Sequence, residues 1–184
     1  MPLLPDPTTA WDRLLAGLPA VQLPRPEVVD PEAMPAWARL LLHHDEHMTE
    51  IMARHHGGPV VVEVQRRHRR GDDYWRQIVL RIADRPAIIQ GGLVRIHLPG
   101  LMPSVAEAIL LERVPLGYLL MDHQVLRRIE LHHLIRFPSD PSLTSWLGGD
   151  PGAPAWGRLA TLHCDEEPVI ELCEVLPPLR EGAV

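Results

Sequence analysis

The chain has 184 residues, of which 46% are hydrophobic and 23% are charged, as in ordinary soluble globular proteins. This length is sufficient to bury a core without disulfide bonds. The formal net charge is −6, and all 18 basic residues are arginine, because the sequence contains no lysine. The absence of lysine excludes enzymes that form a lysine Schiff base and phosphate-binding loops that require a lysine. Scattered arginines in an acidic chain argue against a nucleic-acid partner or a membrane-surface patch.

The sequence predicts a cytoplasmic protein with a single domain over residues 1–184. No run approaches 18 consecutive apolar residues, so we expect no membrane span. The N-terminus has no signal-peptide pattern. Residues 1–34 are rich in proline and predict an extended wrap that contains one short helix, from Thr8 to Gly17, with Thr8 or Thr9 as its cap.

A helical hairpin is expected ahead of the first strand. Residues 35–44 begin with a proline at a first-turn position, which is typical of a helix start. Residues 48–56 form the second predicted helix, which ends at Gly57 in the manner of a helix C-terminus.

The remaining chain alternates between strands and short helical insertions. Between the third and fourth strands, Ser104 with Glu107 matches a capping box, and residues 115–120 predict a short helical turn. Residues 138–154 are rich in proline, serine and glycine and predict a loop. Helices first and antiparallel strands afterwards indicate an α+β fold with one main antiparallel sheet. The predicted strands are residues 60–67, 74–83, 86–98, 125–137, 156–164 and 168–176.

The stretch from Tyr74 to Ala83 is the central strand of this prediction. Its period of two places Arg76 on the same face as Ile78 and Leu80. An arginine cannot lose its charge, and an unpaired buried cation is costly. Arg76 therefore requires an anionic partner, which is a protein carboxylate, a bound anion or both.

The last predicted strand carries a charge of the opposite sign. The same period places Glu174 with Ile170 and Leu172 on one aliphatic face. Two interpretations stay open at this point. In the structural interpretation, Glu174 forms a buried ion pair with Arg76 or lies at a solvated strand end. In the functional interpretation, the two residues line a pocket in which Arg76 holds a carboxylate and Glu174 contacts a hydroxyl.

The histidines suggest a metal site as an alternative. His43 and His47 are four residues apart, which is the spacing of two ligands on one helical face. The pairs His55-His56 and His132-His133 are adjacent and would point to opposite faces of a strand. We favour a histidine-rich polar surface over a metal centre, and expect no cofactor.

Four segments together resemble the chorismate pyruvate-lyase family, whose fold is similar to the ligand-sensing domain of GntR-type transcription regulators. They are Met48-Thr49, the strand segment Tyr74–Ile78, Pro115-Leu116-Gly117, and Glu174. Their order and spacing match between about residue 40 and residue 177. The resemblance implies a buried ligand cavity and a lyase that converts chorismate to 4-hydroxybenzoate and pyruvate without metal or cofactor.

The resemblance also implies roles for individual residues. Arg76 would bind a substrate carboxylate bidentately, and Glu174 would contact the ring hydroxyl. Met48 and Leu116 would line the cavity. The chain departs from the family's pattern in the third strand, where Gln90-Gly91 stands in place of Gly-Arg, so a second arginine that could hold the other carboxylate is missing there.

Three other classes of protein are weighed against the lyase. The first is a non-catalytic domain of the same fold that senses a small carboxylate; such domains follow a basic DNA-binding unit, and residues 1–40 are too short and proline-rich to form one. The second is a metal-dependent enzyme that uses the histidines. The third is a structural or interaction protein.

Overall fold

A computed structural model of the chain describes residues 6–125 and 127–180. The first five residues of the predicted wrap and Leu126, within the predicted strand 125–137, lie outside the described part. The helices are α1 (Pro7–Ala16), α2 (Ala36–Leu42), α3 (Met48–His56), α4 (Pro103–Leu110), α5 (Leu116–Asp122) and α6 (Pro141–Leu147), with 3-10 turns η1 (Pro31–Ala33) and η2 (Leu98–Gly100). The strands are β1 (Glu27–Val29), β2 (Val60–Arg70), β3 (Asp73–Ile82), β4 (Ile88–His97), β5 (Arg127–Phe137), β6 (Ala155–Cys164) and β7 (Glu167–Val175).

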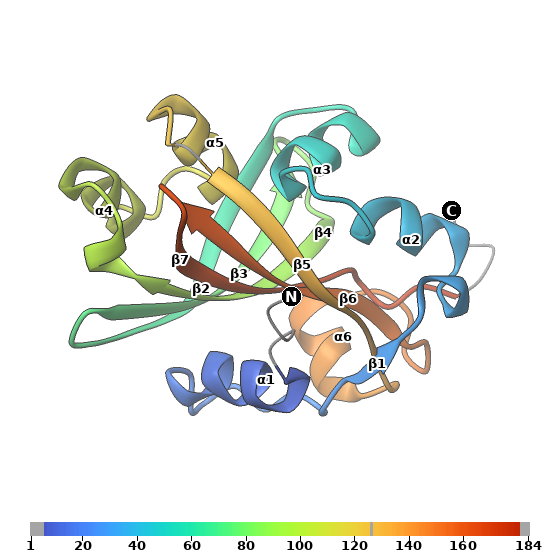
Figure 1. Ribbon diagram of the computed structural model, residues 1–184. Helices are drawn as coiled ribbons and strands as arrows, with labels where there is room; N and C mark the ends of the chain where they lie inside the picture. The colour runs from blue at the N-terminus through green and yellow to red at the C-terminus, as the bar shows by residue number, and fades with distance from the viewer. Residues whose placement is uncertain (1–5, 126, 181–184) are drawn as a thin grey trace.

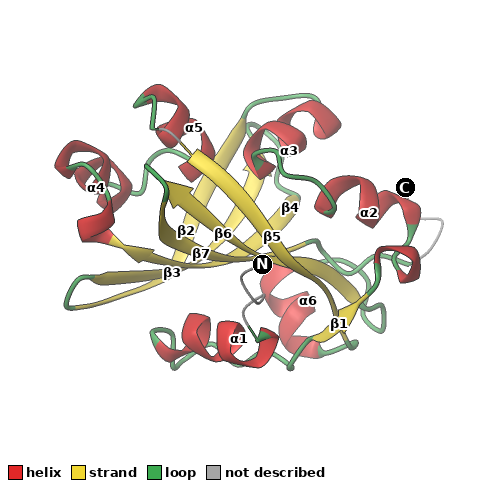
Figure 2. Cartoon of the chain, viewed as in Figure 1, coloured by secondary structure: helices red, strands yellow, loops and turns green. Residues whose placement is uncertain are grey.

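Within the described residues the strands form one sheet in the order β1-β5-β6-β7-β4-β3-β2, and every pair of neighbours is antiparallel. Figures 1 and 2 show α2, α3, α4 and α5 on one side of the sheet and α1 and α6 on the other. The predicted α+β class with an antiparallel sheet and inserted helices is confirmed.

The alternation predicted for the central strand separates two cores. Trp75 and Val79 of β3 pack in the cluster formed with α1 and α6. Ile78 and Leu80 pack in the cluster formed with α2 and α3 on the opposite face. Arg76 therefore points to the face that α2 to α5 cover.

Three local predictions are wrong. The cap of α1 is Asp6, whose carboxylate accepts a hydrogen bond from the Thr9 amide at 2.8 Å. Ser104 does not cap α4, because the helix begins one residue earlier, at Pro103, and its N-cap is Met102. Residues 138–154 are not a loop throughout, since α6 lies in their middle.

Gly91 of β4 marks a close approach between a helix and the sheet. A Cβ atom at Gly91 would lie 2.4 Å from the Leu147 side chain and 2.6 Å from the Trp146 ring, so α6 rests directly on this strand. The pairing of β3 with β4 contains one irregularity among the described residues. Their register shifts between Leu80 and Arg81, ahead of the glycines.

Candidate ligand pocket

A hollow lies between the sheet and the first turns of α3 and α5. Its floor consists of every second residue of β3 from Arg76 to Leu80 and of β4 from Gln90 to Val94. The space between the lining atoms is about 540 Å³ when the solvent at its mouth is included, and about 50 Å³ of it is open to the centre of a water-sized molecule. The hollow brings together Met48, Arg76, Leu116 and Glu174, all four residues that were predicted to bind the substrate.

Two helix starts form the roof. α3 contributes Met48 and Thr49, and α5 contributes Leu116 and Gly117. A Cβ atom at Gly117 would lie 2.7 Å from the Thr49 hydroxyl oxygen, so the two helices approach this closely only because residue 117 is glycine. The N-cap residue of α3, His47, forms no side-chain capping bond, which leaves the positive end of this helix at the pocket.

Arg76 is the central polar feature of the pocket. Its side chain comes from the middle of β3 and is only 1% exposed. Its Nε has no hydrogen-bond partner, and none of the described carboxylates forms an ion pair with its guanidinium. Burial lowers the pKa of Arg76, while the nearby Tyr74 and Glu112 act in the opposite direction.

The carboxylate of Glu112 already has two other partners. It accepts a hydrogen bond from the Tyr74 hydroxyl and forms an ion pair with Arg67 at 2.5 Å. Glu112 therefore moderates the charge of Arg76 from a distance and does not neutralise it by direct contact.

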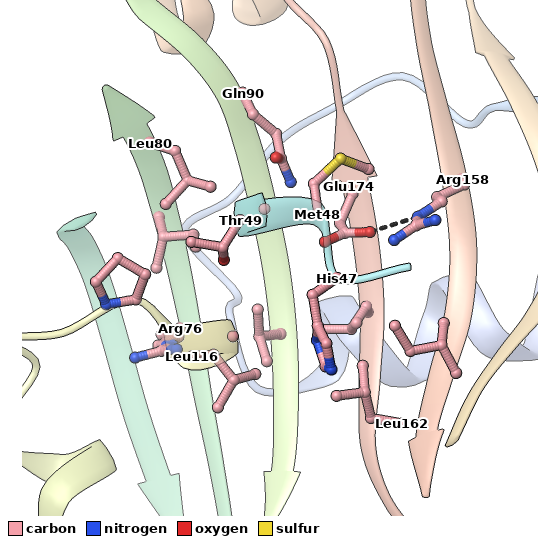
Figure 3. A pocket seen from close by; sticks show the side chains of 17 residues that line it. His47, Met48, Thr49, Arg76, Leu80, Gln90, Leu116, Arg158, Leu162 and Glu174 are labelled. Carbon is pink, nitrogen blue, oxygen red and sulfur yellow. Dashed lines mark hydrogen bonds and ion pairs between the residues drawn. The ribbon is translucent and has the colours of Figure 1, made fainter. Parts of the chain in front are cut away.

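Glu174 lies on the other side of the pocket, two strands away. Its Oε2 accepts a hydrogen bond from Nε of Arg158 at 2.5 Å, and both side chains are buried. Figure 3 shows the other carboxylate oxygen pointing away from Arg158, toward the middle of the pocket. The alternative of an ion pair between Arg76 and Glu174 is wrong, because Arg158 is the partner of Glu174.

Arg158 was not predicted as a site residue, although the pattern of its strand indicates that it faces the interior. It shares a face of β6 with Ala160 and Leu162, which is the same pattern that singled out Arg76. Its guanidinium also donates to the carbonyl oxygen of His44 at 2.8 Å. Arg158 thus ties Glu174 to the connection between α2 and α3.

Gln90 is the remaining buried polar side chain of the sheet that faces the pocket. It precedes Gly91, which stands where the resemblance implies an arginine, and its side chain is 1% exposed. Its Oε1 is buried without a hydrogen-bond partner.

His43 and His47, the two histidines of the alternative metal site, do not share a helical face. α2 ends at Leu42 and α3 begins at Met48, so both histidines lie in the connection between the helices. Nε2 of His44, which lies between them, donates a hydrogen bond to the Leu41 carbonyl oxygen at 2.8 Å. Burial, together with the charge of Arg158, lowers the pKa of His44, which keeps its ring neutral near pH 7.

A second hollow lies at the far ends of α2 and α6. Apolar side chains, such as Trp37, Leu41 and Ile89, dominate its lining. Its arginine, Arg81, is already bonded to Glu63 and to the Pro86 carbonyl. Of these two hollows, the Arg76 pocket is the one whose arginine has no ion-pair partner among the described residues. We therefore take it as the candidate functional site.

Several solved structures are similar to this chain. The effector domain of PhnF from Mycobacterium smegmatis is 11% identical, with 73% of this chain and 91% of that chain covered and a TM-score of 0.46. The C-terminal domain of the histidine utilization repressor from Pseudomonas syringae is 13% identical, with 64% and 91% covered and a TM-score of 0.45. For YydK from Bacillus subtilis the identity is 11% and the TM-score 0.45; the match covers 64% of this chain and 57% of the length of YydK. At these identities and TM-scores the likeness does not reveal what this chain binds or does.

No protein-family model matches the sequence, and no curated protein is significantly similar to it. Membership of the chorismate pyruvate-lyase family therefore stays a proposal. Over residues 6–125 and 127–180, no helix is both long enough and apolar enough to cross a membrane.

Proposed function

We propose that this chain binds a small hydroxylated ring carboxylate in the Arg76 pocket. The single observation that carries the proposal is the burial of the Arg76 guanidinium without an ion-pair partner among the described residues. An unpaired buried cation is unfavourable, and a carboxylate ligand would supply two oxygens in the geometry that a guanidinium prefers.

The charges of the pocket support a ligand with one carboxylate. Apart from His47, the charged side chains that line it are Arg76, Arg158 and Glu174. Because Arg158 and Glu174 neutralise each other at 2.5 Å, one positive charge remains, at Arg76. A monoanion balances this charge, whereas a dianion would bring a second carboxylate into a pocket that contains Glu174.

The spacing of the two ends supports a ring compound. In the sheet register Arg76 is opposite Val94, and Glu174 is opposite Gly92, which precedes Val94 by two residues in β4. Two strand spacings correspond to about 10 Å, and two residues along a strand to about 7 Å. Both side chains rise from the same face, so a six-membered ring between them can place its carboxylate on Arg76 and a hydroxyl on Glu174. A compound of this kind is 4-hydroxybenzoate.

Chorismate pyruvate-lyase activity is the second candidate, and the placement of Met48, Arg76, Leu116 and Glu174 around one hollow favours it. In this reaction the ring carbon that bears the hydroxyl loses its hydrogen, and the ring C–O bond to the enolpyruvyl group breaks. The ring becomes aromatic, and the released group gains a proton at its methylene carbon to become pyruvate. The protein need only hold the reactive conformer and place polar groups around it.

A binding experiment tests the first proposal. We expect titration calorimetry to detect 4-hydroxybenzoate binding to the wild type, and Arg76→Met to weaken it at least tenfold because a charged hydrogen bond is lost. Arg39→Met, which removes an exposed arginine, is the matched control. Equal binding to the wild type and Arg76→Met, or no binding to either, would contradict the proposal.

Incubation with chorismate separates a lyase from a binding domain. If the chain is a lyase, chromatography detects 4-hydroxybenzoate and pyruvate in equal amounts, EDTA has no effect, and Glu174→Gln folds but turns over slowly. A wild type that binds 4-hydroxybenzoate and leaves chorismate intact is a binding domain. Full activity of Glu174→Gln would show that another group contacts the hydroxyl.

A further inference from the structure

We infer that Gln90 makes the pocket specific for rings with two adjacent hydroxyl groups at the end remote from the carboxylate. This inference rests on the proposed function, because it takes the carboxylate to lie on Arg76 and one hydroxyl on Glu174. It adds a third polar contact and narrows the class of ligand from a hydroxybenzoate to a 3,4-dihydroxybenzoate.

The amide of Gln90 lacks a partner inside the protein. The side chain is 1% exposed, and its Oε1 is buried without a hydrogen bond. Leaving such a group unsatisfied costs about 1–3 kcal/mol, and native proteins rarely leave one in this state without a reason. A ligand group in the pocket that Gln90 lines would remove this cost.

The register of the sheet places Gln90 beside Glu174. Gly92 of β4 is directly opposite Glu174 of β7, and Gln90 is two residues from Gly92 on the same face. Diagonal neighbours of this kind are about 7–8 Å apart at the backbone, within reach of long side chains. Figure 3 shows the Gln90 amide directed from its strand toward the part of the pocket next to Met48 and Glu174. The two polar groups can thus contact neighbouring substituents on one ring.

The chemistry of an amide favours a hydroxyl at this position. A hydroxyl both donates and accepts, so it satisfies Gln90 through the carbonyl oxygen or through the N–H group. A second carboxylate would be close to the negative charge of Glu174 and is disfavoured. In chorismate the corresponding ring carbon carries the enolpyruvyl ether oxygen, which only accepts and would require the N–H group.

Two ligands of almost equal size test the inference, 3,4-dihydroxybenzoate and 4-hydroxy-3-methylbenzoate. We expect calorimetry on the wild type to give about tenfold tighter binding of the dihydroxy compound, the worth of one good neutral hydrogen bond. In Gln90→Met, which keeps the length of the side chain, the ratio should fall to near one. Gln77→Met, a buried glutamine on the opposite face of the sheet, should keep the wild-type ratio.

The outcomes separate this inference from the proposed function. If both compounds bind in an Arg76-dependent manner but equally well, or if Gln90→Met keeps the preference, the inference is overturned and the proposed function stands. If neither compound binds to the wild type, both are overturned. A loss of the preference in Gln90→Met but not in Gln77→Met supports the inference.

Discussion

At the scale of single residues, Arg76 is kept in the chain at a cost to stability. The guanidinium is buried beside apolar side chains such as Ile78 and Leu80, and burial lowers its pKa. A residue selected for stability alone would not be an unpaired cation at this position. Such a conflict between local physics and sequence is expected at sites that bind a ligand.

Arg76→Met is therefore predicted to stabilise the ligand-free protein. Methionine fills a similar volume without a charge to desolvate, and replacements of buried ionic groups by apolar residues of similar volume often stabilise by about 1–4 kcal/mol. Urea unfolding monitored by tryptophan fluorescence measures the change. A marked loss of stability in Arg76→Met would mean that the arginine has a structural partner, and that the pocket is not built to receive an anion.

Arg158 presents the opposite case, because its partner is inside the protein. Arg158→Met would leave Glu174 buried without its cation and would remove the hydrogen bond to the His44 carbonyl. We expect a loss of about 3–5 kcal/mol in the free energy of unfolding. Glu174→Gln in the same chain should recover most of that loss, since the uncompensated charge disappears.

A double-mutant cycle in urea measures the coupling between these two residues. Strictly additive effects of Arg158→Met and Glu174→Gln would contradict the assignment of a buried pair. The two arginines thus give stability changes of opposite sign, although both are 1% exposed.

The sequence indicates which charged residues face the interior but not which of them pair. Period-two alternation was sufficient to place Arg76 and Glu174 on interior faces, and it applies equally to Arg158. The pairing depends on the strand order, because β6 lies next to β7 whereas β3 is separated from β7 by β4. The order of strands in a sheet is not contained in the period of any one strand.

At the scale of elements, adjacent glycines of β4 serve the two faces of the sheet separately. Gly91 accommodates α6, whereas Gly92 is part of the pocket floor, opposite Glu174. A Cβ atom at Gly92 would lie 3.0 Å from Cγ1 of Ile78, across the floor. A substitution at Gly91 therefore tests the packing of α6 on the sheet, and a substitution at Gly92 tests the pocket on the other face.

Gly91→Ala should lower the free energy of unfolding by about 1–3 kcal/mol, as overpacking usually does, because the new methyl group meets Leu147 and Trp146. The affinity for 4-hydroxybenzoate should change little. Gly92→Ala should lower the free energy of unfolding by less than Gly91→Ala does. It should weaken ligand binding, because the new methyl group raises the pocket floor. Urea unfolding and calorimetry on both variants check this contrast, and each variant is the control for the other. A loss of affinity in Gly91→Ala alone would contradict it.

Elements with strong periodicity were predicted well, whereas short elements were not. The strands from residue 60 onward and the helix over residues 48–56 agree with the observed elements within a few residues. α6 was missed because seven residues between prolines and glycines resemble a loop, although Asp140 caps it by accepting from the Ser142 amide at 2.8 Å. β1 has only three residues, and it is a strand because of its pairing with β5. Such pairing cannot be read from the local sequence.

At the scale of the whole molecule, each side of the sheet has a partly buried histidine whose charged form is disfavoured. His44 lies on the pocket side and contacts Arg158, and His132 of β5 lies on the other face, where its Nε2 is 2.8 Å from the Thr161 hydroxyl. Burial is the main cause that lowers the pKa of each; Arg158 adds to it at His44, and Glu130 opposes it at His132.

These two histidines predict that the protein loses stability as the pH falls below neutral. In the unfolded chain a histidine has its ordinary pKa of about 6.5. The folded state has lower pKa values, so between the two values the unfolded state binds more protons, and the free energy of unfolding rises with pH. The contribution is fully present above the unfolded pKa and is lost as the pH falls through the folded values. Urea unfolding between pH 7.5 and pH 5 should therefore show a decreasing free energy of unfolding.

His132→Gln tests the origin of this dependence. Glutamine can keep a hydrogen bond to the Thr161 hydroxyl but does not titrate, so the decrease between pH 7.5 and pH 5 should become smaller. His68→Gln removes an exposed histidine and should keep the wild-type decrease. An unchanged decrease in His132→Gln would place the effect at other groups, with His44 beside the Arg158–Glu174 pair the first to examine. A decrease centred on His44 would then connect the acid stability of the whole fold to the charge balance of the pocket.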